Sequence, residues 1–290
     1  LAAMGSGWTL GGVRQSGRDP AELPLARAAI ERWAELDARL DGRPGYRRRG
    51  NLRLARDEAE AQIIADLVAA QAKTGLAIEL LDGPAARRLA PALSQGVVAA
   101  SFCPGDGHAD PVAAVEAFAD AARRLGGRIE TGVAACALIA RGGRIVGVET
   151  AAGPIEADVT VLASGLAAPA LLAPLGLDLP LAPKIVQVLQ TTPQPSLFDQ
   201  VFGVANADCA GRQEIDGRLR VTTGIGDWQG DAQHWSGEQL QPSAGDVATL
   251  IRRVGAVLPA LLGAGVARVW GGLIDLTPDG LPALDAPLPG

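Results

Sequence analysis

The stretch GGRIVGVETAAGPIEADVTVLASG, residues 142–165, decides the fold that this sequence predicts. It begins with two short strand-like pieces, 144–150 and 153–157, which a small turn separates as in an antiparallel meander. The apolar run DVTVLA at 158–163 is typical of a parallel strand covered on both faces. It ends at Ser164 and Gly165, and open α/β sheets bind ligands at the turn that follows such a strand. The stretch therefore predicts an α/β protein with a ligand site near this turn.

The segment GDGHADPVAAVEAFADAARRLGG, residues 105–127, precedes this stretch and has the clearest helix pattern in the chain. Asp110 stands at the expected N-cap and Pro111 at the first helical position, while Gly126 ends the helix. Two more strand-like pieces, 128–131 and 135–141, lead from the helix into the meander. The side chains expected on the buried face of the helix are Val112, Val115, Ala119, Ala122 and Leu125.

Mixed helix and strand patterns continue outward in both directions. Apolar residues spaced by three and four positions predict a helix from Leu25 to Leu40, and Asp57 is the expected N-cap of a second helix that Gly75 closes. Strands are expected at 50–55, 76–81 and 97–103, several more in an antiparallel sheet within 184–225, and one from 269 onward, with further helices at 84–93 and 244–257.

The composition excludes several classes of function. The 290 residues are 48% apolar, enough for one or two domains with a core, and a net charge of −6 offers no basic surface to nucleic acid. No apolar run approaches the roughly 18 residues of a membrane span and no signal-peptide pattern opens the chain, so we expect a cytoplasmic protein without a membrane span. Chemistry by such a chain would rest on a cofactor.

Cysteine and histidine usage predicts no metal centre and no disulfide framework. Cys103, Cys136 and Cys209 are too far apart for a zinc clip and odd in number. With only two histidines, His108 and His234, the chain has no three-histidine site. His108 stands before the Asp110 cap and is open to an acid–base role or to simple packing, and His234 gives no directional signal.

A glycine cluster lies near the start of the chain, GSGWTLGGVR at residues 5–14. By spacing alone it is similar to a dinucleotide fingerprint, whose glycines turn the chain from a strand into a helix and present N–H groups to a pyrophosphate. Only four residues precede the cluster, so that strand is lacking here. A plain loop therefore remains an alternative to the fingerprint.

Six segments, in their order along the chain, resemble the FAD-dependent D-amino-acid oxidase superfamily. Within it the sequence looks most like glycine oxidase, the sarcosine oxidase beta subunit and hydroxyproline dehydrogenase. The resemblance implies FAD as cofactor and a glutathione-reductase-like FAD-binding fold, α/β in class, with an interleaved α+β substrate domain built on an antiparallel sheet. The segments are GGVRQ (11–15), RRGNLRLA (48–55), PGDGHADP (104–111) with the helix after it, RIETGV (128–133), residues 142–165, and WGGLIDLTPDGLP (270–282).

The resemblance also implies how the domains divide. Residues 1–44, 92–182 and 266–290 would form the FAD-binding domain, and 45–91 and 183–265 the substrate domain. Family members begin with a strand, a G-x-G-x-x-G loop and a helix, and end with a segment that closes over the flavin. By this comparison the sequence looks truncated at both ends, so we expect these 290 residues alone to bind FAD weakly or not at all.

Carried over position by position, the resemblance assigns cofactor contacts to a flavin-side loop, to one backbone group near adenine and to the turn beside the cofactor. In the loop, glycines allow close backbone approach and the arginine lies near the isoalloxazine. Trp8 departs from the small or polar residues usual before this loop, so its indole would either hinder the pocket or rest against the flavin. The assigned residues are Gly11, Gly12, Val13 and Arg14, then Val133, and then Ala163, Ser164 and Gly165.

The segment 270–282 differs from its family counterparts at one position. Glycine oxidase and D-amino-acid oxidase carry an arginine where Ile274 stands, and that arginine grips the substrate carboxylate through a bidentate pair. The resemblance therefore implies another cation for a carboxylate substrate, although each candidate is otherwise a solvated surface charge. The candidates for substrate contact are Arg14, Arg49, Lys184 and, from the segment itself, Trp270.

The activity that the resemblance implies is oxidation of a secondary amine or amino acid, such as sarcosine, glycine or a proline derivative. A hydride would move from the substrate to flavin N5, with catalysis by positioning and desolvation rather than by an assigned catalytic side chain. The electron acceptor, oxygen or a partner protein, and any partner subunit are not specified. The alternative from another class is a non-catalytic flavoprotein-like scaffold or subunit that lacks the cofactor-binding unit.

Overall fold

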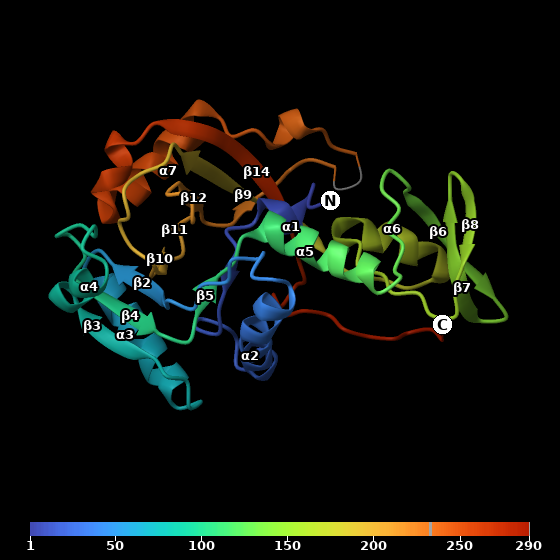
Figure 1. The fold of residues 1–290 in the computed structure, drawn as a ribbon, viewed down its shortest axis with the longest axis horizontal. Helices are drawn as coiled ribbons and strands as arrows, with labels where there is room; N and C mark the ends of the chain where they lie inside the picture. Colours follow the sequence, from blue (N-terminus) through green and yellow to red (C-terminus); the bar gives the residue numbers. More distant parts are fainter. Residues whose placement is uncertain (232–233, 290) are drawn as a thin grey trace.

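A mixed sheet of nine strands organises the residues that the structure describes, 1–231 and 234–289 of a computed structural model (Figure 1). Among these residues, neighbouring strands of the sheet are antiparallel except β2 and β10, where Val201 stands opposite Asn51. β9 pairs along its whole length with β14, and elsewhere with β12 and β13. From one edge to the other the strands are β14 (Val266–Leu276), β9 (Ala182–Thr191), β13 (Gly226–Asp227) and β12 (Leu219–Thr223), β11 (Cys209–Gln213), β10 (Val201–Val204), β2 (Asn51–Ala55), β4 (Ala99–Cys103) and β3 (Glu79–Asp82).

One face of this sheet carries the main hydrophobic core. Alternate side chains of the strands, such as Leu52 and Leu54 of β2 and Val221 of β12, are buried there against α4 (Gly83–Leu89) and α7 (Ala244–Val257). Because successive side chains of a strand point to opposite faces, burial of this set directs the intervening residues to the other face. That second face holds the candidate site.

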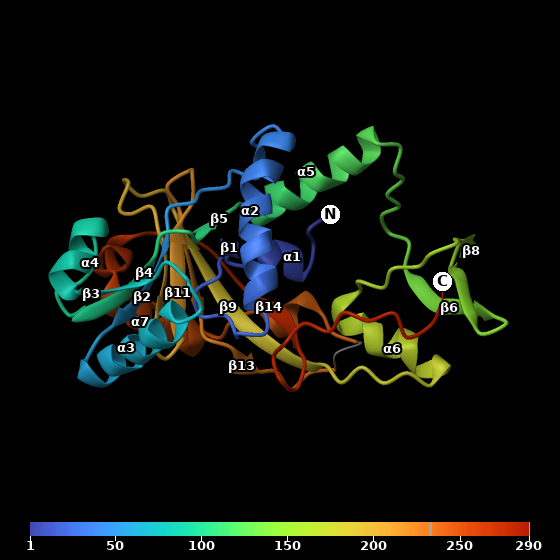
Figure 2. The ribbon, with the colours of Figure 1, turned by 90° about the horizontal axis from the view of Figure 1, so that it is seen from below.

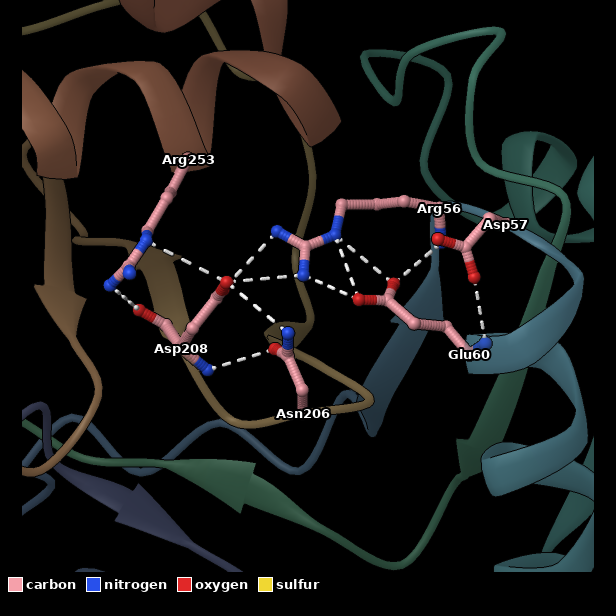
Figure 3. A network of polar contacts seen from close by, with 6 residues as sticks. All are labelled: Arg56, Asp57, Glu60, Asn206, Asp208 and Arg253. Atoms are coloured by element: carbon pink, nitrogen blue, oxygen red, sulfur yellow. Dashed lines mark hydrogen bonds and ion pairs between the residues drawn. The ribbon is translucent and has the colours of Figure 1, made fainter.

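An ion-pair network ties the start of α3 (Glu58–Ala72) to α7 across the turn between β10 and β11 (Figure 3). The Arg56 guanidinium lies 2.5 Å from the Glu60 carboxylate and 3.1 Å from that of Asp208, and these acids raise the pKa of Arg56. Arg253 of α7 lies 3.7 Å from Asp208 on the other side. At the helix start, the Asp57 side chain accepts a hydrogen bond from the backbone N–H of Glu60, which confirms the predicted cap.

The remaining elements lie beside the large sheet, and the small sheet β6–β7–β8 stands at the opposite end of the molecule from α3 and α4 (Figures 1 and 2). The predicted meander at 135–157 is confirmed as this small sheet. The elements are α1 (Gly5–Trp8), α2 (Leu23–Arg39), α5 (Pro111–Arg124), α6 (Ala168–Leu172), the pair β1 (Gly12–Val13) and β5 (Gly107–His108), and β6 (Ala135–Arg141), β7 (Arg144–Thr150) and β8 (Gly153–Glu156), with 3-10 turns at 165–167, 173–175, 237–240 and 259–263.

Two predicted strands in this part were wrong. Residues 128–131 and the run at 158–163 form no strand, and Val161 is 84% exposed. A strand of the predicted type needs neighbours on its edges, and the described part of the chain places none beside the 158–163 run. An apolar composition alone therefore did not suffice to form the strand.

The predicted buried face of α5 was also partly wrong. Its capping is as expected, since the Asp110 side chain accepts from the N–H of Ala113 and Pro111 opens the helix. The helix contacts α1, but Leu125, expected on the buried face, is 89% exposed. The residues that α5 buries are Pro111, Ala114, Ala117 and Ala119, of which only Ala119 belongs to the predicted stripe.

The predicted domain boundaries cut through the large sheet. β4 falls in the segment 92–182 yet pairs with β2 and β3, and β14 falls in 266–290 yet pairs with β9. A sequence pattern locates a strand without giving its partners, so the domain division stays a prediction. Residues 232, 233 and 290 of the predicted domains lie outside the described residues. None of the helices described is long and apolar enough to cross a membrane.

Candidate functional site

Residues 9–17, which we call the cross-sheet loop, run over the second face of the large sheet from β12 to β2. Three strands hold this loop with polar side chains. Arg220 of β12 donates to the carbonyl oxygen of Thr9 at 3.0 Å, and Arg212 of β11 donates to that of Leu10 at 2.5 Å. Asn51 of β2 donates to the hydroxyl of Ser16 at 2.9 Å. The loop is therefore positioned by residues that lie 35 to 211 places away in the sequence.

Glu214 supplies one negative charge next to both arginines. Its carboxylate lies 3.3 Å from Arg212 Nη2 and 2.7 Å from Arg220 Nε, and it accepts a further hydrogen bond from Gln190. The Arg212 side chain is only 2% exposed, and burial lowers its pKa to about 10, so it stays charged at neutral pH. A buried charge without a partner is costly, which makes Glu214 necessary where both arginines are buried.

Asp106 and Gln71 fix the far end of the cross-sheet loop. The buried Asp106 carboxylate accepts hydrogen bonds from the backbone N–H groups of Gln15 and Ser16 and from the Ser16 hydroxyl, at 2.8, 3.2 and 2.5 Å. Gln71 of α3 accepts from the N–H of Gly17 at 2.9 Å. These bonds satisfy backbone groups that a buried loop would otherwise leave unpaired.

The two glycines at the centre of the loop, Gly11 and Gly12, differ in what surrounds them. Gly11 has φ +78°, and a Cβ there would lie 2.4 Å from the carbonyl oxygen of Ala109, so both conformation and space require glycine. At Gly12 a Cβ would meet no heavy atom within 4 Å. The backbone at Gly12 is thus open to a molecule beside it.

A cavity of about 2170 Å³ lies between the cross-sheet loop, α2, the turn at 163–165 and the second face of the sheet. Val186, Val188, Ala210 and Thr222 form its floor. The structure brings most of the predicted cofactor residues to this one cavity; those that line it are Gly12, Val13, Arg14, Ala163, Ser164 and Gly165. Gly11 adjoins this set, and Val133, which is partly exposed, precedes the lining residues 134–136.

The lining fits a large, flat and mainly apolar group together with a small substrate. The volume exceeds the roughly 300–1,000 Å³ of common ligand pockets. Leu25, Ala29 and Trp33, from the apolar stripe of α2, face the cavity, and the backbone at Gly12 is accessible because a Cβ there would meet no heavy atom within 4 Å. The residues present are therefore compatible with a flavin.

Arg14 is a lining cation without an acidic partner among the described residues. Its Nη1 donates to the carbonyl oxygen of Ser16 at 2.9 Å. Burial first, and then the charges of Arg18 and Arg53, lower its pKa to about 10 against the charges of Asp106 and Glu22, which raise it, so it remains protonated at neutral pH. Arg18, which also lines the cavity, is paired with Glu22 at 3.1 Å.

The other predicted substrate contacts do not line the cavity. Arg49 is exposed, and Lys184 forms an ion pair with Asp227. Trp270 is buried, and two guanidinium groups lie near its ring centroid, Arg220 at 5.3 Å and Arg268 at 4.7 Å, so its ring is engaged in cation–π contacts. Of this group, Arg14 alone is among the described residues that line the cavity.

Three residues that the sequence singled out do line the cavity. Ile274 stands there, at the position where the family comparison expects an arginine. Trp8 packs edge to face on Trp235 with ring centroids 5.8 Å apart, and a Cβ at Gly272 would lie 3.0 Å from its Cβ. His234 also lines it and lies 3.0 Å from Asp231. The Trp8 indole thus forms part of the wall.

His108 belongs to the support of the cross-sheet loop and not to the cavity wall. It is 1% exposed, and its Nδ1 lies 3.3 Å from Nη1 of Arg212. Because a guanidinium only donates, Nδ1 accepts, and in the neutral ring Nε2 carries the proton. Burial and the charges of Arg212 and Arg47 lower the pKa of His108 to about 4. This arrangement favours the packing interpretation over acid–base catalysis.

The cysteines show no sign of reactive thiolates. Cys103 and Cys209 are buried, and burial raises both pKa values to about 12. Cys136 is exposed and lines the cavity. Across residues 1–231 and 234–289, no group of three or more His, Cys, Asp or Glu side chains could hold a metal ion.

The sequence reasoning missed four charged residues of this region, namely Arg53, Arg212, Glu214 and Arg220. A signal was present, because Arg220 stands in RLRVTTG between apolar positions of a predicted strand. A charged side chain at such a position predicts a buried polar partner. It does not say which part of the chain supplies that partner.

Comparisons with known proteins connect this cavity to a family. The family described as FAD dependent oxidoreductase matches residues 2–290. The D-amino acid dehydrogenase of Methylobacterium nodulans is 30% identical over 89% of this chain and 61% of its own length, and the glycine oxidase of Bacillus licheniformis is 28% identical over 89% and 67%. The chain thus spans about three fifths of the length of the first of these relatives.

Solved structures show the same fold. Glycine oxidase from Geobacillus kaustophilus superposes with a TM-score of 0.88 at 23% identity, over 98% of this chain and 76% of its own. L-proline dehydrogenase from P. horikoshii superposes with a TM-score of 0.87 at 23% identity, over 98% of this chain and 75% of its own. These findings confirm the superfamily resemblance and FAD as the family's cofactor, and D-amino acid dehydrogenase is a relative that the sequence reasoning did not name. This chain belongs to the FAD dependent oxidoreductase family.

Proposed function

We propose that this chain forms the flavin and substrate cavity of an enzyme that oxidises an amine or amino acid, by hydride transfer from the carbon next to the substrate nitrogen. The observation that carries the proposal is the gathering of residues 12–14 and 163–165 around one cavity over the second face of the sheet. Sarcosine, glycine and proline-type compounds are the proposed substrates. The names of the relatives add D-amino acids to this group.

The cavity residues would act by positioning and by excluding water. FAD bound there would supply the hydride acceptor. The backbone at Gly12 allows a flat ring to approach, and the apolar side chains of α2 keep water from it. Arg14 provides positive charge near the substrate. We also propose the domain division expected from the sequence, with residues 1–44, 92–182 and 266–290 on the flavin side and residues 45–91 and 183–265 on the substrate side.

Flavin reduction tests this function. The protein encoded by the full reading frame that contains the chain is purified, and its visible spectrum is recorded with and without added FAD. The protein is then mixed, in the absence of oxygen, with sarcosine, glycine, D-proline and D-alanine. We expect a bound-flavin spectrum that one or more of these compounds bleaches. A colourless protein that does not retain FAD would contradict the proposal and favour the non-catalytic scaffold.

A further inference from the structure

Arg53 of β2 is a cation that the proposed function leaves without a role. Its side chain is partly buried, and its guanidinium makes no hydrogen bond or ion pair with any described residue. Burial lowers its pKa. Since an unpaired charge taken out of water costs free energy, a partly buried arginine of this kind is suited to an anion that binds from outside the chain.

The sheet register places Arg53 in line with the cavity floor. Arg53 stands opposite Gly203 of β10, Gly203 opposite Ala210 of β11, and Ala210 opposite Thr222 of β12. Residues directly opposite one another on paired strands project to the same face. Ala210 and Thr222 line the cavity, and Gly203, which has no side chain, is the one residue between them and Arg53. Arg53 therefore extends the row that forms the floor.

Arg14 meets Arg53 from the cross-sheet loop above. A Cβ at Gly17 would lie 2.7 Å from Nη2 of Arg53 and 3.1 Å from Nη1 of Arg14, so both guanidinium groups converge on this glycine. The nearby acids are engaged elsewhere: Glu22 pairs with Arg18, and Asp106 accepts from residues 15 and 16. The two guanidinium groups thus lie side by side, with Arg14 in the cavity lining and Arg53 next to it. The charges of Asp106 and Glu22 act on Arg14, but no described carboxylate forms an ion pair with either arginine.

We propose that Arg14 and Arg53 together hold the carboxylate of the amino-acid substrate at this end of the cavity. The two arginines would bind the carboxylate in place of a cation at position 274, because Ile274, which lines the wall there, has no charge to bind an anion. A guanidinium suits this task because its planar donors match the two oxygens of a carboxylate. The assignment of this carboxylate to a substrate rests on the proposed function, but the binding of a carboxylate to the arginine pair does not.

A binding experiment without flavin tests the arginine pair. Propionate, propionamide and inorganic phosphate are titrated into the purified chain, with the fluorescence of the lining Trp8 and Trp33 as one readout and calorimetry as the other. We expect propionate to bind and propionamide not to bind. Arg53→Met should weaken the binding of propionate at least tenfold. Arg53→Lys should weaken it less, because lysine keeps the charge. Arg49→Met, at an exposed arginine four residues away, is the matched control and should change the affinity less than twofold.

Each other outcome counts against the inference. Absence of propionate binding, or equal affinities in Arg53→Met and Arg49→Met, would overturn it. Phosphate that binds more tightly than propionate and displaces it would assign the pair to a phosphate group instead. If thermal unfolding shows that Arg53→Met does not fold, Arg53→Gln, which keeps a polar side chain of similar length, replaces it.

Kinetics separate this inference from the proposed function. In the complete enzyme Arg53→Met should raise KM for the amino acid at least tenfold and leave kcat within threefold, since the pair binds the substrate away from the reacting carbon. An unchanged KM overturns the carboxylate assignment while the oxidase or dehydrogenase function stands. Failure of every amine to reduce the flavin contradicts the proposed function. It does not affect the propionate experiment, which tests anion binding without flavin.

Discussion

Arg212 is the residue whose removal should most disturb the cross-sheet loop. Arg212→Met deletes the donor to the Leu10 carbonyl and leaves the buried Glu214 with Arg220 and Gln190 as its side-chain partners. Loss of one member of a buried ionic group costs about 3 kcal/mol, so we expect a decrease of this order in the free energy of unfolding. Amide hydrogen exchange of residues 9–14 should also become faster.

The control for Arg212 lies on the same hairpin. Arg218 is partly exposed and pairs only with Asp216, so Arg218→Met should change the unfolding free energy by less than about 0.5 kcal/mol. Urea unfolding and hydrogen-exchange mass spectrometry compare the two variants. Equal effects would show that Arg212 does not hold the loop.

His108 should make the protein less stable in acid. Its pKa is about 4 in the folded chain against 6.5 for the free side chain, because of burial first and then the charges of Arg212 and Arg47. Between these values the unfolded state binds more protons, so the contribution of His108 is complete above pH 6.5 and is lost as the pH falls toward 4. The full loss amounts to about 3 kcal/mol.

A substitution isolates this contribution from that of the carboxylates. In His108→Asn the amide oxygen still accepts from Arg212, but the side chain no longer titrates. Unfolding free energies measured from neutral pH to pH 4.5 should therefore fall less steeply than in the parent. His234→Asn, at an exposed histidine, should keep the parental slope. If His108→Asn has that slope too, His108 is not buried in its neutral form.

At the level of single residues, the family resemblance named residues that the fold brings together, since residues 12–14 and 163–165 line one cavity. Their contact with a cofactor stays a prediction. Arg53 could not be predicted in the same way. Its place in the site depends on strand register across β2, β10 and β11, which no local pattern contains.

Among the elements, α3 offers a direct test of a predicted cap. The Asp57 carboxylate accepts from the N–H of Glu60 at 2.8 Å, so Asp57→Ala should lower the unfolding free energy by about 1 kcal/mol. Asp57→Asn keeps an oxygen acceptor and should cost less than half as much. Urea denaturation measures both. Equal losses would point to the charge of Asp57 and not to its cap.

Elements with end signals were predicted best. α7 begins after the Ser243 cap and covers the expected 244–257, and α2 follows the three-and-four spacing of its apolar residues. β11 was not predicted as a strand, since CAGRQ has no β-branched or aromatic residue, and pairing with β10 and β12 forms it instead. The predicted strand at 158–163 failed for the converse reason, because composition cannot supply a neighbour.

For the whole molecule, the reactivity of the thiols reports on the packing against both faces of the large sheet. Cys103 and Cys209 are buried and Cys136 is exposed, so Ellman's reagent should modify one thiol per native chain and all three in guanidinium chloride. Cys136→Ser should abolish the native reaction. Rapid native modification of the Cys136→Ser chain would show that β4 or β11 is not packed as described.

The predicted cytoplasmic location stays a prediction.

The parallel pairing of β2 with β10 has a consequence for how the chain is made. Asn51 meets Val201 only after about 150 further residues have been synthesised, which takes on the order of 10–30 s at ribosomal speed. Until then β2, β4 and β3 form a half-sheet whose edge at β2 lacks its partner, and such an edge can pair with other chains. Closing so long a loop is also slow. Yield from cell-free synthesis should therefore depend on chaperones that cover this edge on the nascent chain.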